Sequence, residues 1–178
     1  MSEPETQKPI EIDDLLSFEQ TYREKVGDES CDEAFYRVGL TLELGSDLRD
    51  CWCEPTNVIA LADTHMDGAH FALMRSEDEP VLYGPVVLIA PDSSERPHVI
   101  VGDSLREFLC LGCYSGYNFG ELPHNPEVLI KSIEQATEPR HELLSDLCEH
   151  FELAPWIGVA ARLVELQDLY LDELVIGD

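Results

Sequence analysis

The chain has 178 residues, and 37 Asp and Glu against 11 Lys and Arg give it a formal net charge of −26. This charge argues against direct binding to nucleic acid, because phosphate contacts require a basic patch. It also disfavours docking on an anionic membrane surface. The hydrophobic fraction of 44% is enough to form a core, which argues against an intrinsically disordered chain.

The first residues, 1–10, are polar and acidic and predict a polar arm rather than a signal peptide. No apolar run approaches the roughly 18 residues that would span a bilayer. We therefore expect a cytoplasmic protein without a membrane partner. The length predicts a single domain over 11–178, in which the C-terminal helices of 126–174 are either part of that domain or an appended helical part.

A helix is expected after the arm, with Asp13 or Asp14 as its cap and Gly27 at its end. Its apolar residues recur at spacings of three and four: Leu15, Phe18, Tyr22 and Val26. Residues 31–45 fit two structures, because their first half has helical spacing and 40–44 alternates as a strand does. Residues 45–47 indicate a turn.

The middle of the chain is expected to form a β-meander. Its predicted strands are 57–62, 69–74, 86–90 and 98–101. A charged connection, 75–80, follows the second strand, and 91–97 is a turn cluster. The continuous apolar run 86–90 predicts a central strand that is covered on both faces.

The last third of the chain is expected to be helical. Asp103 or Ser104 can cap a helix that carries Leu105 and Phe108. The glycine-rich and aromatic loop 112–120 can either form a recognition surface or fold back into the core. Three more helices are predicted at 126–136, 139–153 and 155–174. The order of helix, meander and helices indicates an α+β fold with a mostly antiparallel sheet, packed by an N-terminal helix and a C-terminal helical segment.

Two cysteine pairs raise the alternative of a zinc site. Cys51 and Cys53 flank a tryptophan, and Cys110 and Cys113 follow an apolar helical pattern. Four thiolates can bind zinc tetrahedrally, but a spacing of one residue is shorter than the usual ligand knuckle. We expect reduced cysteines, with Cys110 and Cys113 on the core side of a helix end.

A second group of possible ligands lies in 63–70, which contains His65 and His70. Its acidic residues do not fit a calcium loop, because Met74 stands where the bidentate acid is required. Asp67-Gly68 is typical of a turn between two strands. We favour the turn over a histidine site.

The motifs of the common enzyme classes are missing from the sequence. It contains no nucleophile elbow, no phosphate-binding loop and no dinucleotide-binding fingerprint. Carboxylates are so frequent that an acid pair carries no specificity as a signal. We therefore expect no enzymatic activity, no cofactor and no catalytic or metal-binding residues.

Several segments between residues 55 and 136 resemble the SUKH superfamily, which contains bacterial toxin-immunity proteins and a yeast regulator of glucan synthesis. They are 55–62, 67–73, 84–91 and 101–112. The family pattern Asn-Leu-x-Glu-Phe-Leu is matched by 104–109, with Ser104 in place of the asparagine. The resemblance implies a non-enzymatic protein that binds a toxin or effector.

The net negative charge of the chain further predicts that this partner is a basic protein, because acidic surfaces attract basic partners. The alternatives are a regulatory scaffold, as the yeast member implies, and a zinc-binding or enzymatic protein. Acidic residues on two predicted loops are our candidates for partner binding: Glu77, Asp78, Glu79, Asp92 and Glu95.

Overall fold

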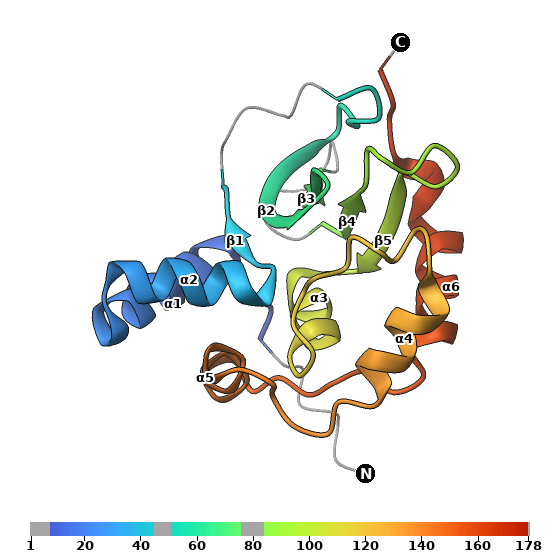
Figure 1. Cartoon of the computed structure of the whole chain (residues 1–178). Helices are drawn as coiled ribbons and strands as arrows, with labels where there is room; N and C mark the ends of the chain where they lie inside the picture. The colour runs from blue at the N-terminus through green and yellow to red at the C-terminus, as the bar shows by residue number, and fades with distance from the viewer. Residues whose placement is uncertain (1–7, 45–50, 76–83, 178) are drawn as a thin grey trace.

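The computed structural model describes residues 8–44, 51–75 and 84–177. Helices lie on both sides of an antiparallel sheet that the middle of the chain forms, so the predicted α+β fold is confirmed. The helical hairpin of α1 and α2 lies at one side of the sheet, and α4 and α6 lie at the other (Figure 1). The described residues contain no helix with the length and apolar character that crossing a membrane requires.

Helix α1, Ile12–Val26, begins two or three residues earlier than its acidic residues suggested. Its N-cap is Glu11, and the prediction of Asp13 or Asp14 was wrong. The Glu11 amide donates a hydrogen bond to Asp14 Oδ2 at 3.0 Å. The Asp14 carboxylate, in the first turn, therefore accepts the backbone hydrogen bond of the N-cap residue. Gly27 ends the helix as predicted, with φ of 89°, and α2, Asp28–Val38, follows directly.

Both structures that the sequence allowed for residues 31–45 occur, one after the other. Helix α2 ends at Gly39, whose φ of 72° is left-handed and favours glycine. The short strand β1, Thr41–Leu42, then pairs with β2. The predicted turn at 45–47 lies outside the described residues.

The predicted meander is confirmed. The described strands are β1, β2 (Val58–Met66), β3 (Ala69–Met74), β4 (Val86–Ile89) and β5 (His98–Gly102). They are ordered β1-β2-β3-β4-β5, and each pair of neighbours is antiparallel. Asp67 and Gly68 form the β2–β3 turn, with φ of 47° and 77°. Strand β2 is longer than expected, because its last residues also pair with β3. Most of the charged connection after β3 lies outside the described residues.

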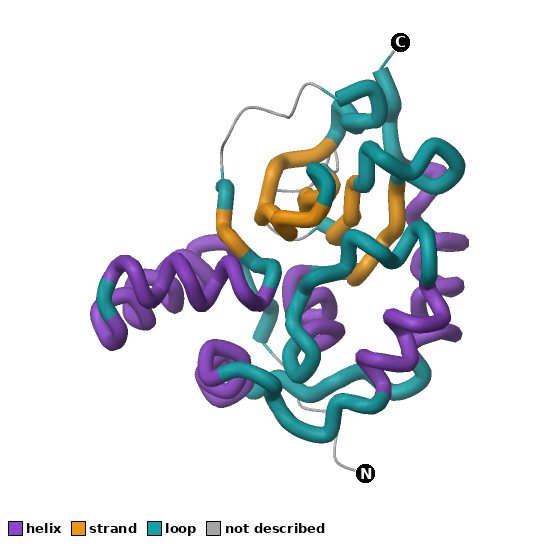
Figure 2. The backbone as a smooth tube through the Cα atoms, in the orientation of Figure 1, coloured by secondary structure: helices purple, strands orange, loops and turns teal. Residues whose placement is uncertain are grey.

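Strand β4 is covered on both faces, as its continuous apolar run predicted. Val86 and Leu88 belong to the main core, which α1, α2, α3 and α5 share. Val87 and Ile89 belong to a smaller cluster on the opposite face, with Leu166 of α6. Apolar side chains therefore cover both faces of the sheet, and Figure 2 shows its strands between the α1–α2 hairpin and α6.

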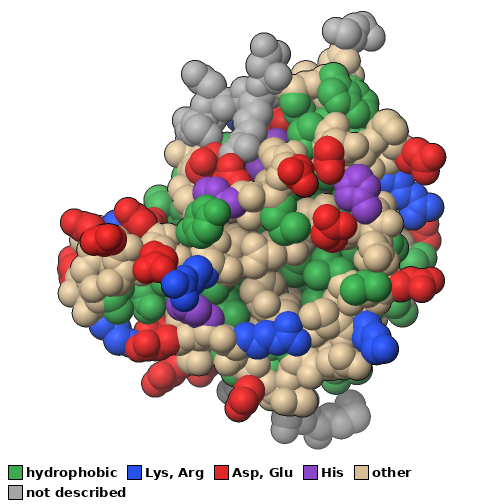
Figure 3. Space-filling view, viewed as in Figure 1, with side chains coloured by type: hydrophobic (Ala, Val, Ile, Leu, Met, Phe, Trp, Pro, Cys, Tyr) green, Lys and Arg blue, Asp and Glu red, His purple; other side chains and the backbone are tan. Residues whose placement is uncertain are grey.

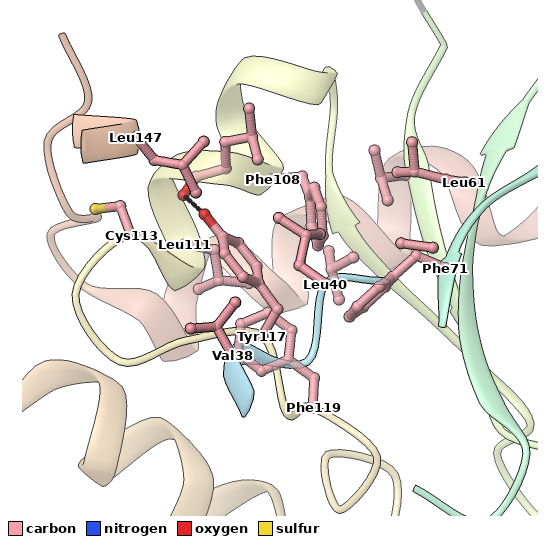
Figure 4. Close-up of a cluster of buried hydrophobic side chains, with 14 of the residues drawn as sticks. Val38, Leu40, Leu61, Phe71, Phe108, Leu111, Cys113, Tyr117, Phe119 and Leu147 are labelled. Atoms are coloured by element: carbon pink, nitrogen blue, oxygen red, sulfur yellow. Dashed lines mark hydrogen bonds between the residues drawn. The ribbon is translucent and has the colours of Figure 1, made fainter. Parts of the chain in front are cut away.

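The main core centres on α3, Leu105–Gly112, which Ser104 caps by accepting a hydrogen bond from the Glu107 amide at 3.2 Å. Phe108 is fully buried, with its ring 4.7 Å from that of Phe71 and 5.1 Å from that of Tyr117. The glycine-rich loop thus folds back into the core rather than forming a recognition surface (Figure 4).

Replacing Tyr117 with phenylalanine is expected to lower the free energy of unfolding by about 1–3 kcal/mol. The Tyr117 hydroxyl donates to the Leu109 carbonyl at 2.7 Å inside the core, and this bond is the dashed line in Figure 4. Phenylalanine keeps the ring but leaves that carbonyl without this donor. Urea denaturation measures the change, and Tyr36→Phe on the exposed face of α2 is the matched control. Equal effects of the two variants would contradict the prediction.

The C-terminal helices are α4 (Pro126–Glu134), α5 (Glu142–Phe151) and α6 (Val159–Tyr170). The prediction of one helix over 155–174 was wrong at both ends. Gly158 takes a left-handed φ of 70° before α6, and the chain tightens into a 3₁₀ turn, Leu171–Glu173, after it. Helix α5 shares the main core with α1, since the rings of Phe18 and Phe151 lie 5.7 Å apart.

Candidate functional site

Helix α6 lies along the free edge of the sheet, beside β5. The Gln167 side chain accepts a hydrogen bond from the Ile100 amide at 2.7 Å and donates one to the Ile100 carbonyl at 2.9 Å. The side-chain amide therefore occupies the place of a neighbouring strand at the middle of β5. This pairing holds α6 at the edge and leaves a hollow between α6, β5 and α4.

That hollow is a groove of about 650 Å³, which we call the β5–α6 groove. Its wall is mostly apolar and includes Val99, Leu122, Ile130, Leu163, Val164 and Leu171. The volume lies within the range of roughly 300–1,000 Å³ that is typical of binding sites. Leu174 and Ile176 of the C-terminal segment also line the wall.

Several apolar side chains of the groove are open to solvent. Val164 is 62% exposed, and Leu171 and Ile176 are also exposed. Exposed apolar residues that lie together, with polar residues around them, are typical of surfaces that bind another molecule. Figure 3 shows apolar side chains between the carboxylates on one face of the molecule.

The charged residues of the groove wall are mainly acidic. Glu95, from the β4–β5 loop, and Glu127, from the first turn of α4, both line the groove, and Arg96 adds one positive charge. Glu95 is one of the residues that the sequence proposed for partner binding. Asp92, another of them, lies in the same loop and pairs with His124 at 3.0 Å. Glu77, Asp78 and Glu79 lie outside the described residues.

Sequence reasoning did not find Trp52, which lies next to the same loop. Its ring is 65% exposed, and Nε1 donates to the Pro91 carbonyl at 3.1 Å. The Cys53 carbonyl is 2.6 Å from His98 Nε2, and His98 itself lines the groove. The Cys-Trp-Cys motif was visible in the sequence, but exposure depends on the segment that packs beneath it.

A buried polar pair lies behind this turn, and no sequence signal indicated it. The side chain of His70, in β3, is 2% exposed, and that of Glu54 is 7% exposed. His70 Nε2 lies 3.0 Å from Glu54 Oε2. His70 Nδ1 lies 3.0 Å from the Gly68 carbonyl, which can only accept, so Nδ1 carries a proton. The other ring nitrogen, Nε2, is therefore the one that faces the Glu54 carboxylate.

The two histidines of 63–70 are therefore separated. His65, with φ of 59°, lies against Tyr36, with 4.4 Å between ring centroids and the ring planes tilted by 38°, and its Nε2 lies 2.7 Å from the Thr41 hydroxyl. His70 points instead to Glu54. The turn that we favoured is confirmed, and the structure does not assemble a site from both rings.

The two cysteine pairs lie on opposite faces of the sheet. Cys53 belongs to the smaller cluster beneath α6, whereas Cys113 belongs to the main core. Burial raises the pKa of Cys53 to about 12, with a further contribution from the Cys51 thiol, and burial also raises the pKa of Cys113. Within the described residues, no group of three or more His, Cys, Asp and Glu side chains is arranged to hold a metal ion.

Comparisons with protein families, with curated proteins and with solved structures found no match to this chain.

Proposed function

We propose that this chain is a non-enzymatic protein-binding module whose partner is a basic protein, of the toxin or effector kind that the SUKH resemblance implies. The observation that carries the proposal is an apolar groove with carboxylates at its wall, in a chain with a net charge of −26. Apolar surface supplies the affinity of such a contact, and the carboxylates select a partner with Lys and Arg.

The groove fits an amphipathic helix of the partner better than a strand. Strand addition requires free backbone groups on β5, and the Gln167 side chain occupies both groups of Ile100. An apolar helix ridge can instead contact Val164 and Leu171, while basic side chains beside it reach Glu95 and Glu127. The proposed ligand is thus a basic amphipathic helix.

The test uses a synthetic helical peptide of Leu and Lys, about 18 residues and therefore roughly 27 Å long. A peptide of the same composition in shuffled order is the control for unspecific attraction to an acidic protein. Calorimetry is expected to show at least about tenfold tighter binding of the amphipathic peptide, which corresponds to ~1.4 kcal/mol. Its association rate is expected to fall as salt is added.

Two protein variants locate the contact. Val164→Asp places a charge in the groove and is expected to weaken binding about tenfold or more, since burying an unpaired charge is costly. Leu169→Asp adds the same charge on the same helix, at a residue that is 52% exposed and outside the groove wall, and should leave affinity nearly unchanged. Equal binding of both peptides, or equal effects of both variants, would refute the proposal.

A further inference from the structure

The turn before β2 brings two thiols and a carboxylate together. Cys51 Sγ lies 3.4 Å from Cys53 Sγ and donates to Glu54 Oε2 at 3.4 Å. Cys51 is partly exposed, whereas Cys53 is buried beneath it. The proposed protein-binding function leaves this cluster unused, since none of its three residues lines the groove.

We propose that Cys51 and Cys53 are a redox-active dithiol that exchanges with a low-molecular-weight disulfide of the glutathione type. Cys51 is the attacking thiol, because it is the one that solvent reaches. Cys53 is the resolving thiol, because its sulfur is already in contact with that of Cys51.

Glu54 and His70 supply the arrangement that an attacking thiol needs. The thiolate, not the thiol, is the nucleophile, so Cys51 must lose a proton. The Glu54 carboxylate is the acceptor within reach, and His70 Nε2 lies 3.0 Å from Oε2, the oxygen that Cys51 contacts, and 3.3 Å from Oε1. A nucleophile, a base and a group that orients the base are the recurring parts of an activated nucleophile. His70 is a positioning residue here.

The thiol–disulfide exchange takes place in two steps. In the first, Cys51 passes its proton to Glu54, and its sulfur attacks the glutathione disulfide, which forms a mixed disulfide and releases one glutathione thiolate. In the second, Cys53 loses its proton to solvent and attacks Cys51 Sγ, which releases the second glutathione. The protein dithiol loses two electrons and two protons, and one disulfide becomes two thiols.

The other neighbouring thiols lack this arrangement. Cys113 is fully buried, and the Cys148 thiol donates to the Cys113 backbone carbonyl at 3.4 Å rather than to a base. Burial raises the pKa of both thiols. We therefore expect oxidation to select the pair at 51 and 53.

Trp52 offers an optical readout, because it lies between the two cysteines and its exposed ring is tied to the Pro91 carbonyl. Closing the disulfide changes the backbone of this turn, so tryptophan fluorescence should change with oxidation. Trp156→Phe removes the other tryptophan and makes the signal specific. Because burial raises the pKa of Cys53 to about 12, Cys53 is protonated near neutral pH, and the second step should accelerate as pH rises.

The test incubates the full chain with defined ratios of oxidised and reduced glutathione, blocks the remaining thiols and maps the peptides by mass. The expected result is an intramolecular disulfide between Cys51 and Cys53, lost again when reduced glutathione is added. A persistent glutathione adduct, oxidation of Cys113 and Cys148 at the same rate, or no reaction would overturn the proposal.

Variants then assign the roles. Cys53→Ser should stop the reaction at the mixed disulfide on Cys51, and Cys51→Ser should abolish it, whereas Cys110→Ser is the control that changes nothing. Glu54→Gln should slow the first step about a hundredfold or more, within the range for general bases. An unchanged rate in a folded Glu54→Gln protein would refute the role of Glu54, and circular dichroism confirms the fold of each variant.

Discussion

Replacing Glu54 with alanine is expected to lower the free energy of unfolding by about 3–5 kcal/mol. The Glu54 carboxylate and the His70 ring lie 3.0 Å apart, and both side chains are almost inaccessible to water. Alanine removes the partner of His70 Nε2 and leaves that polar ring buried, so the folded state bears the cost of its desolvation. Urea denaturation followed by circular dichroism measures the loss.

A double variant separates the energy of the pair from the cost of leaving one partner alone. Glu54→Leu combined with His70→Leu removes both polar groups, and replacing a buried pair with apolar residues is often close to neutral. We therefore expect the double variant to be more stable than Glu54→Ala. If it is equally or more destabilised, the pair itself contributes the stability and our account is wrong.

Replacing Phe108 with alanine is expected to destabilise the protein by about 3–5 kcal/mol, because it opens a cavity at the centre of the main core. The Phe108 ring contacts those of Phe71 and Tyr117, so the site lies between the sheet and the folded-back loop. These neighbours are fully buried and packed from several sides, which limits how far they can close the cavity. The loss is a large part of the roughly 5–15 kcal/mol that stabilises a domain.

The matched controls for Phe108→Ala test the cause. Val128→Ala removes an exposed side chain from α4 and should change stability by less than about 0.5 kcal/mol. Phe108→Leu retains most of the volume and should cost clearly less than alanine. Equal losses for leucine and alanine would show that the aromatic contacts, rather than the cavity, determine the effect.

The local sequence pattern was sufficient to predict the structure of segments whose signal lies within a few neighbouring residues. The apolar run of β4 requires cover on both faces, Asp67-Gly68 suits a tight turn, and Ser104 offers an oxygen to the start of α3. Ends of elements were predicted less well. The true cap of α1 is Glu11, which no capping preference favours, and the Asp14 side chain completes it.

The candidate sites depended on residues far apart in the chain. Gln167 occupies the edge of β5 from 67 positions away, and the pairing of Glu54 with His70 spans a strand and a turn. Val164 had the same apolar character as its buried neighbours on α6, yet it lies open in the groove. No periodicity distinguishes such a residue, because exposure is set by what packs against the helix.

The sequence by itself determined the α+β class, the order of the meander and the sign of the charge, because periodicity, turn residues and composition are local properties. Only the tertiary structure decided where carboxylates meet apolar surface and which thiol meets a base. The reason is physical: the 37 acidic residues are spread along the whole chain, and only folding places two of them at the wall of one groove.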